Sequence, residues 1–346
     1  MRPARQREIV SIVRNQPLCS ISIIKERLLE TVSIPTLNRE LAYLVSNRVL
    51  VREGSGRALK YRLADSFCLF YEIDLESYFA KNVDNRNAHT EFSADLLSLI
   101  ARTSLLTSKE TNDCELLQRE FQKNVQSIPS TLYKKEMERL TIELSWKSSQ
   151  IEGNTYSLLE TELLLKDRLH AAGRSPEEAT MLLNHKSCLE YILQNKSLGS
   201  SLNISMIEDL HTILTTELQV ERSLRRRSVG ITGCAYKPLD NQYQIREATS
   251  SMCSIVNVKT NVFERALVAL LLISYIQPFE DGNKRTGRMV SNSILIAGDA
   301  CPLSYRSVDP ITYKEAMLVF YEQHSVSAFK ELFLQQAEFA ARNYFR

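Results

Sequence analysis

The segment from Gln277 to Arg288 constrains the chain most, because it joins two apolar stretches through a short run of charged residues. Residues 262–276 before it are almost entirely apolar, and apolar residues follow it at helical spacing, so the pattern predicts a helix, a short loop and a second helix. Gly282 and Asn283 end the first pattern and open the second. Unpaired backbone N–H groups should gather there and, with the positive end of the helix dipole, form an anion site.

Charged side chains in the same segment favour a phosphate as that anion. Arg285 and Arg288 are three residues apart, so they share one face of the first helical turn and offer forked donors that suit phosphate oxygens. Cations at a helix N-terminus oppose the dipole, so a solvated basic turn explains them less well than phosphate binding does. Asp281 at the edge of the loop supplies a hard oxygen ligand for a phosphate-bound Mg²⁺.

The segment resembles the signature loop of the Fic-domain family, His-x-Phe-x-[Asp/Glu]-Gly-Asn-[Gly/Lys]-Arg-x-x-Arg. Most members move AMP from ATP to a protein hydroxyl, and the Doc branch moves a phosphoryl group. The resemblance implies ATP and Mg²⁺ as cofactors, a hydroxyl of a protein target as acceptor, and Asp281 as metal ligand. It implies a catalytic set of Gln277, Asn283 and Arg285, and nucleotide binding by Gly282, Asn283, Lys284, Arg285, Gly287, Arg288 and Tyr313.

One position departs from the family pattern, because Gln277 stands where the family has its general-base histidine. An amide cannot accept a proton from an attacking hydroxyl at neutral pH, and loss of a general base typically costs about 10²–10⁴-fold in rate. We therefore expect a slow or inactive AMP transferase. The alternative is a non-enzymatic, nucleotide-sensing transcriptional regulator that binds DNA. Phosphoryl transfer as in Doc is a third hypothesis, suggested by Lys284.

A second motif lies ahead of the loop, where Ser148, Glu152 and Gly153 resemble the inhibitory motif of Fic proteins, [Ser/Thr]-x-x-x-Glu-[Gly/Asn]. In the family the glutamate reaches the second arginine of the loop and blocks the γ-phosphate position. The resemblance implies a Glu152–Arg288 ion pair, in which a carboxylate takes the place of a phosphate oxygen. Because the motif belongs to the same chain, the inhibition would be intramolecular.

Residues 224–244 combine short alternation with glycines, a pattern that predicts a β-hairpin. The hairpin resembles the Fic flap, which holds the target segment by strand pairing through main-chain hydrogen bonds. A simple surface hairpin is the alternative. The residues expected to form the flap are Val229, Gly230, Ile231 and Thr232.

Residues 1–62 hold twelve basic and five acidic side chains, although the whole chain has a net charge of only +2. Three short helical patterns and two strands about a glycine turn resemble a winged helix-turn-helix. Its third helix would enter a DNA major groove and its wing would contact phosphates. Winged helices also dock proteins, and a steep salt dependence would favour DNA. The residues expected at DNA are Thr36, Asn38 and Arg39 on the helix and Arg52, Arg57 and Lys60 on the wing.

These patterns together predict a mostly α fold: a winged helix-turn-helix domain over 1–64, a helical connector over 65–130, and a Fic domain with its inhibitory helix over 131–346. The Fic core is expected to be all-helical with a β-hairpin flap. The seven cysteines show no paired spacing, and the longest apolar run, 266–276, is too short to cross a bilayer. We expect a cytoplasmic protein with no membrane partner, and consider a homodimer.

Overall fold

The computed structural model describes residues 4–346, apart from the side chain of Arg57. The described chain is mostly helical, as the sequence predicts, and its β-structure is one three-stranded sheet and an isolated bridge. The chain divides into two compact units. Unit 1 runs to Ile73 and takes in Gln323–Ser327, and unit 2 comprises Asp74–Glu322 and Ala328–Arg346.

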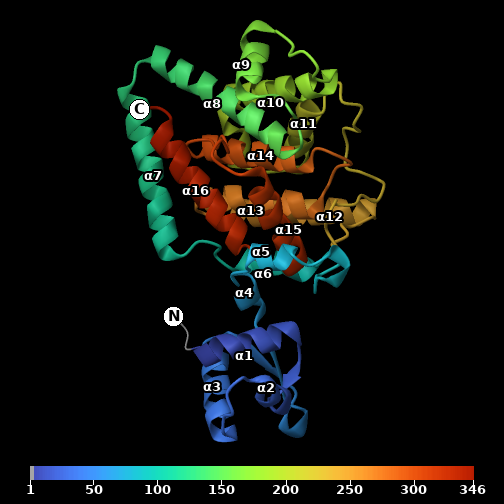
Figure 1. The fold of residues 1–346 in the computed structure, drawn as a ribbon. Helices are drawn as coiled ribbons and strands as arrows, with labels where there is room; N and C mark the ends of the chain where they lie inside the picture. Colours follow the sequence, from blue (N-terminus) through green and yellow to red (C-terminus); the bar gives the residue numbers. More distant parts are fainter. Residues whose placement is uncertain (1–3) are drawn as a thin grey trace. The chain divides into compact units, whose positions relative to one another are not determined.

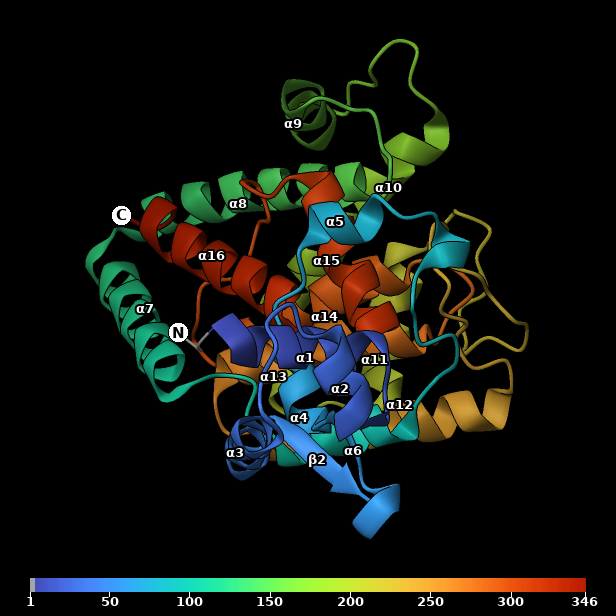
Figure 2. The ribbon, with the colours of Figure 1, turned by 60° about the horizontal axis from the view of Figure 1, so that its bottom comes forward.

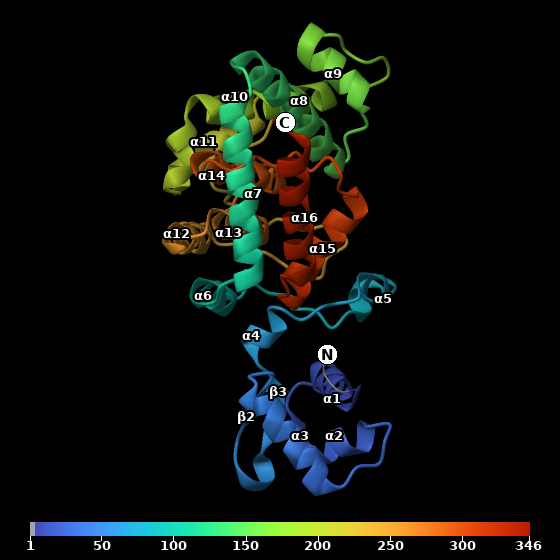
Figure 3. The same ribbon diagram turned by 90° about the vertical axis from the view of Figure 1, so that its left-hand side faces the viewer.

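Unit 1 contains the three helices and the hairpin that the sequence predicts, arranged around one antiparallel sheet of order β1-β3-β2 (Figure 3). Its elements are α1 (Ala4–Asn15), β1 (Cys19–Ser20), α2 (Ile21–Arg27), α3 (Ile34–Ser46), β2 (Leu50–Glu53), η1 (Gly56–Ala58), β3 (Lys60–Leu63) and α4 (Asp65–Cys68). Ser33 caps α3 by accepting a hydrogen bond from the Thr36 amide, and Pro35 lies in its first turn. The inner face of α3 is apolar and buried, so it joins the core of the unit.

A short segment distant in sequence completes unit 1. The Val326 amide donates to the Leu69 carbonyl oxygen over 2.8 Å, and Ser325 Oγ donates to the Tyr71 carbonyl oxygen over 2.6 Å. Arg14 Nη2 donates to Gln323 Oε1 over 2.8 Å. Unit 1 is therefore discontinuous in sequence.

Unit 2 is a helical assembly in which α13 and α14 lie at the centre (Figure 1). Helices α8 and α10 run side by side, and α9 lies beyond them (Figure 2). Its elements are α5 (Leu75–Phe79), η2 (Val83–Asn85), α6 (Ala94–Arg102), α7 (Ser108–Ser127), α8 (Ser130–Ile151), α9 (Leu158–Asp167), α10 (Pro176–Gln194), η3 (Lys196–Ser200), α11 (Ile204–Leu214), α12 (Gln242–Val258), α13 (Val262–Ile276), α14 (Asn283–Ala297), α15 (Pro310–Gln323) and α16 (Ser327–Asn343).

The centre of unit 2 is organised by α13, in which every residue from Ala266 to Ile276 is fully buried. A helix that is apolar on all sides is buried on all sides, which explains the long apolar run in the sequence. Gly287 lets α14 approach α13 closely, because a Cβ there would lie 3.1 Å from Leu270 Cδ1. No helix in the described residues combines the length and apolarity needed to cross a bilayer.

The β-hairpin predicted over 224–244 does not form in the described chain. Residues 224–241 consist of turns and loops, with one isolated parallel bridge between Lys237 and Glu91, and the last three residues of the segment already belong to α12. The groups that a hairpin ladder would use have other partners: the Ala235 amide donates to buried Glu322, and the Lys237 amide donates to the Thr90 carbonyl oxygen. The guanidinium of Arg225 binds further carbonyl groups of the segment, which are then unavailable to a ladder.

The packing of η3 on α14 yields a stability prediction. A Cβ at Gly199 would lie 2.2 Å from the backbone oxygen of Ser293, so Gly199→Ala forces backbone apart and should lower the free energy of unfolding by about 1–3 kcal/mol or more. Gly230→Ala is the matched control, because a Cβ there meets nothing within 4 Å; its effect should stay within about 0.5 kcal/mol. Urea denaturation measures both, and equal stability of the two variants would contradict the close approach of η3 to α14.

Candidate functional site

The loop between α13 and α14 is closed by its own side chains. Gln277 ends α13 in the left-handed region, with φ 51° and ψ 61°. The Asn283 side chain accepts a hydrogen bond from the Phe279 amide and donates one to the Phe279 carbonyl oxygen, both over 2.8 Å. Phe279 is buried and stacks on the His211 ring with 3.7 Å between centroids, and His211 Nε2 donates to the Asp281 carbonyl oxygen over 3.0 Å. The loop is therefore fixed from within and from α11.

The first turn of α14 has free backbone donors. Gly282 precedes it with φ +81°, and a Cβ there would lie only 3.3–3.5 Å from Thr215, His211 and Arg285, so both conformation and space favour glycine. No side chain caps this helix, whereas Asn261 caps α13. The first intrahelical bond runs from the Thr286 amide to the Gly282 carbonyl oxygen, so the preceding amides remain available to an anion.

Arg285 adds a buried donor to this turn. Its side chain is 3% exposed, and Nη2 donates to Asp281 Oδ2 over 2.7 Å. Nη1 is buried and has no hydrogen-bond partner in the described chain. An unpaired buried donor of a charged group is costly, so Nη1 indicates a missing ligand oxygen. Lys284 is half-buried beside it, while Gly287 lies on the face of α14 that packs against α13.

Arg288 is fully buried and bound to the end of α8. Its Nη2 donates to Glu152 Oε1 over 2.7 Å and to the Ser148 carbonyl oxygen over 3.0 Å, and its Nε donates to Ser148 Oγ over 2.8 Å. The predicted Glu152–Arg288 ion pair is confirmed. Tyr313 is also buried, with its ring centroid 5.4 Å from the Arg288 guanidinium carbon. Gly153 follows the glutamate with φ +102°, which favours glycine.

The charge of Glu152 is set by competing effects. Burial alone would raise the pKa of this carboxyl, but the positive charges of Arg288, Lys284 and Arg285 and the hydrogen bond from Arg288 overcome burial and lower the pKa. The carboxylate is therefore ionised at neutral pH. It occupies the position beside Arg288 that an anionic ligand oxygen would need.

His185 on α10 holds the Ser148 side chain through a hydrogen bond. Its Nδ1 lies 2.8 Å from the Met181 carbonyl oxygen and therefore carries the proton, so Nε2 accepts from Ser148 Oγ at 2.8 Å. Burial lowers the pKa of His185 to about 3, so the ring stays neutral. The bonds form a buried series in which Arg288 donates to Ser148, Ser148 to His185, and His185 to the backbone of α10.

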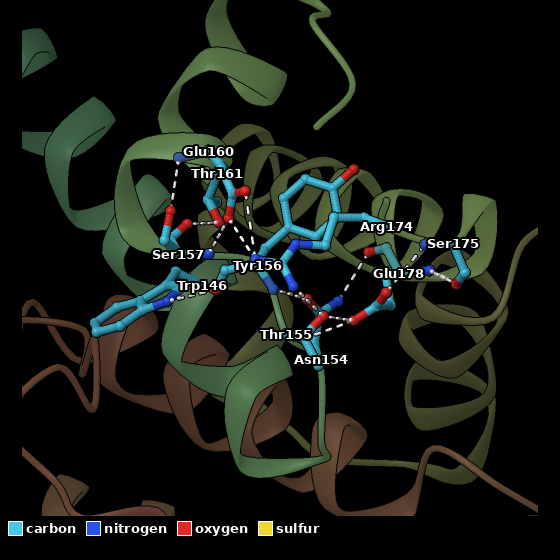
Figure 4. A network of polar contacts seen from close by, with 10 residues as sticks. All are labelled: Trp146, Asn154, Thr155, Tyr156, Ser157, Glu160, Thr161, Arg174, Ser175 and Glu178. Atoms are coloured by element: carbon cyan, nitrogen blue, oxygen red, sulfur yellow. Dashed lines mark hydrogen bonds and ion pairs between the residues drawn. The ribbon is translucent and has the colours of Figure 1, made fainter. Parts of the chain in front are cut away.

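The segment after Glu152 is held by a polar network at the starts of α9 and α10 (Figure 4). Thr155 donates through its amide and its hydroxyl to Glu178 Oε1, over 2.6 and 2.7 Å, and Arg174 joins Thr155 to Glu160. Glu160 and Glu178 also complete the capping boxes of the two helices. The remaining members of the network are Trp146, Asn154, Tyr156, Ser157, Thr161 and Ser175. The network fixes the end of α8 and with it Glu152.

Gln277 brings no base to the site. Its side chain is 7% exposed, and Nε2 donates to the Ser274 carbonyl oxygen over 2.6 Å. The two buried histidines of the site cannot substitute at neutral pH. Burial lowers the pKa of His211 to about 4, and that of His185 to about 3, so both are weak bases. Both ring nitrogens of His185 are also committed to hydrogen bonds.

The predicted metal ligand Asp281 lies at the edge of the loop with a 69% exposed side chain. The described residues contain no group of three or more His, Cys, Asp or Glu that could hold a metal ion. A single carboxylate beside a phosphate site nevertheless fits Mg²⁺, which is commonly held by one or two carboxylates together with the phosphates of a substrate.

The predicted flap residues lie in the irregular segment ahead of α12. Val229 and Ile231 are half-buried, and Gly230 and Thr232 are exposed. The Ile231 carbonyl oxygen accepts a turn bond from the Cys234 amide over 3.2 Å. In the described chain the backbone groups of the other three have no backbone partner, so they are available to an added strand.

The residues predicted to bind DNA lie on α3 and the β2–β3 hairpin of unit 1. Thr36 is half-buried, and its hydroxyl bonds Ser33 Oγ over 2.9 Å. The side chain of Arg57 lies outside the described residues. The other predicted positions are exposed, and the cations among them have no carboxylate partner in the described chain: Asn38, Arg39, Arg52 and Lys60.

Sequence patterns missed three residues that shape the site: His185, His211 and Arg225. Each histidine lies on an apolar helix face, which is typical of a core or boundary residue and does not reveal a partner far away in sequence. Arg225 is one of three consecutive arginines, and the sequence does not distinguish the buried one.

Comparison with known proteins agrees with this geometry. The sequence profile of the Fic/DOC family matches residues 201–295. A protein adenylyltransferase Fic from Nematostella vectensis is 26% identical over 246 residues, which span 68% of this chain and 57% of the relative. Protein adenylyltransferase fic-1 from Caenorhabditis elegans is 25% identical over 160 residues, 44% of this chain and 31% of the relative. The chain thus matches between a third and somewhat over half of these relatives.

Solved structures share the fold. Residues 134–508 of Caenorhabditis elegans Fic-1 superpose with a TM-score of 0.60 at 19% identity, covering 99% of this chain and 92% of that one. A Fic-domain-containing signalling protein from Bacteroides thetaiotaomicron gives a TM-score of 0.54 at 20% identity, covering 66% of this chain and 95% of that one. These structures show that the fold is shared, and the profile match identifies residues 201–295 as a Fic/DOC domain.

Proposed function

We propose that the protein is a Fic-type AMP transferase that uses ATP, is inhibited by its own Glu152, and works slowly or not at all because Gln277 replaces the general base. The observation that carries the proposal is the first turn of α14. There, uncapped amides, the unpaired Nη1 of Arg285 and the buried Arg288 point to a ligand with several anionic oxygens. The curated relatives are named as protein adenylyltransferases, which supports ATP and a protein target.

In the proposed reaction the oxygen of a target hydroxyl bonds to the α-phosphorus of ATP, the hydroxyl proton passes to water, and pyrophosphate leaves with the electrons of the broken bond. The amides of residues 282–285, with Lys284 and Arg285, stabilise the charge on the phosphates. Asp281 and the phosphates would hold Mg²⁺, which supplies further neutralising charge. Asn283 keeps the loop in shape through Phe279. Gln277 orients the hydroxyl, but its amide cannot take the proton.

The inhibition follows from competition for Arg288. A γ-phosphate oxygen and the Glu152 carboxylate would bind the same guanidinium. Glu152 Oε1 already lies 2.7 Å from Arg288 Nη2 and is held there by the end of α8. The γ-phosphate of ATP therefore reaches Arg288 only when the Glu152 carboxylate moves away from it. The buried Ser148 and His185 keep Arg288 in place in either case, because their bonds to it do not involve the carboxylate.

Nucleotide affinity tests the inhibition. Glu152→Gln keeps the shape of the side chain but removes its charge, so ATP should bind about tenfold more tightly, the difference between a charged and a neutral hydrogen bond. Glu138→Gln removes an exposed carboxylate from the same helix and should leave affinity unchanged. Isothermal titration calorimetry measures both. Equal affinity of Glu152→Gln and the parent protein would contradict the inhibitory role.

Transfer of AMP is tested with ATP labelled at the α-phosphate. The parent protein should gain little label, whereas the double variant Gln277→His with Glu152→Gly should gain label about 10²–10⁴-fold faster. Gln277→Asn with Glu152→Gly is the matched control and should gain label at least about 10²-fold more slowly than the histidine variant, because asparagine offers no base. An unlabelled Gln277→His double variant would reject the transferase and leave the nucleotide-sensing alternative.

A second candidate function rests on unit 1. Three helices and a hairpin expose Arg39, Arg52 and Lys60 without carboxylate partners in the described chain. Unpaired cations on one recognition helix and one wing favour DNA phosphates as their partner. We propose that this unit binds DNA, either alongside a transferase or as the output of a nucleotide-sensing regulator.

Salt dependence tests DNA binding. The triple variant Arg39→Ala, Arg52→Ala and Lys60→Ala should bind duplex DNA more weakly and lower the slope of log affinity against log salt by about 0.9 for each phosphate that it no longer neutralises. Lys25→Ala removes an exposed cation of α2 and serves as control. Fluorescence anisotropy with a labelled random duplex measures both. Parent binding that is absent, or insensitive to salt, would favour a protein-docking role.

A further inference from the structure

Arg225 is fully buried among backbone carbonyl groups where the flap segment meets the loop before α14. Its Nε donates to the Gln277 carbonyl oxygen over 2.6 Å, and its own amide donates to the Pro278 carbonyl oxygen over 2.9 Å. Its Nη1 donates to the Arg227 carbonyl oxygen over 2.8 Å, and its Nη2 donates to the Leu239 carbonyl oxygen. One side chain thus connects both ends of the flap segment to the backbone of residue 277.

The two halves of the flap segment are held differently. The half that follows residue 232 has several anchors: Arg86 Nη1 donates to the Gly233 carbonyl oxygen, Ala235 donates to Glu322, and Tyr236 Oη donates to the Tyr275 carbonyl oxygen. For residues 226–232 the described chain offers two bonds: the one from Arg225 to the Arg227 carbonyl oxygen, and a turn bond from the Cys234 amide to the Ile231 carbonyl oxygen. That front half contains the positions expected to hold a target segment.

The binding of Arg225 depends on the shape of a guanidinium. No carboxylate pairs with it in the described chain, and burial lowers the pKa of Arg225, yet arginine stays charged in proteins. Three carbonyl oxygens in different directions match its planar fork. A lysine ammonium carries its donors on one nitrogen and cannot reach all three carbonyl oxygens in this geometry. Arg225→Lys is therefore not a conservative substitution.

We propose that Arg225 is a positioning residue that fixes the front half of the flap relative to residue 277, so that a hydroxyl carried on the flap meets the α-phosphate. The proposal rests on the transferase proposed above and names a residue that acts through the backbone without touching substrate. Displacement by 1 Å from a near-attack arrangement can cost about 10²-fold in rate, so a single fixing group can control transfer.

The chain supplies matched controls beside the residue in question. Arg226 and Arg227 follow Arg225 directly, but both are exposed. Arg226→Lys therefore makes the same chemical change one position away without disturbing the hydrogen bonds to the carbonyl groups. Arg225→Lys and Arg225→Met are the test variants, and Arg225→Lys is the decisive one where the methionine variant does not fold.

The first experiment measures opening of the flap in the otherwise unaltered protein. Limited trypsin digestion, followed by mass spectrometry, gives the rate of cleavage after Arg227, a residue that no variant alters. Arg225→Lys should speed this cleavage about tenfold or more, because it loses charge-assisted hydrogen bonds, while cleavage elsewhere and the urea midpoint change little. Arg226→Lys should match the parent. Cleavage of Arg225→Lys at the parent rate, or faster cleavage throughout the chain, would overturn the proposal.

The second experiment measures self-labelling from α-labelled ATP in the Gln277→His, Glu152→Gly background. Arg225→Lys should lower the maximal rate at least about tenfold and leave the half-saturating ATP concentration unchanged, because the nucleotide is held by α14. A changed ATP requirement with an unchanged maximal rate would overturn the positioning role. If the background itself takes no label, the transferase proposal fails, and trypsin cleavage alone decides whether Arg225 holds the flap.

Discussion

The site depends on one buried positive charge, the guanidinium of Arg288, at the meeting of α8, α10 and α14. A charge without solvent must be paired, and an unpaired one would cost several kcal/mol. Three neighbours meet much of that need: Ser148 accepts from Nε, Glu152 accepts from Nη2, and the Tyr313 ring lies alongside. Nη1 is buried and has no hydrogen-bond partner among the described residues. The Glu152–Arg288 ion pair is therefore also part of what stabilises the interior of the fold.

The rigidity behind this arrangement comes from two sources. Helix α13 is buried along its length and cannot shift without disturbing the core, so the loop that follows it is fixed at one end. The polar network at the starts of α9 and α10 fixes the end of α8 independently of Arg288. Glu152 therefore approaches the loop from a helix that is held on both sides. In the proposed function, a phosphate would compete with a carboxylate whose conformational entropy is already lost.

A structural feature can be predicted from the sequence when the interactions that produce it are local in the chain. The loop, the uncapped α14 and the Glu152–Arg288 pair follow from short motifs, and the central helix follows from the composition of residues 262–276. The hairpin predicted over 224–244 does not form, and its absence could not be predicted, because hydrogen bonds with Glu322 and Thr90, which are distant in sequence, override the local alternation. The same holds for His185, whose role exists only because α10 packs against α8. Gly287 lies within the signature loop pattern and was therefore predicted to bind nucleotide, yet in the structure it packs against Leu270.

The discontinuity of unit 1 has a consequence for how such a chain can be rearranged. Val326 is fully buried and its amide bonds Leu69, although more than 250 residues separate them. A gene truncated after the first unit would lack the piece that closes it. A gene lacking that unit would keep Val326, an apolar side chain that is fully buried in the intact chain. Recombination that swaps one N-terminal module for another must therefore also refit the α15–α16 turn, which ties the inheritance of the two parts together.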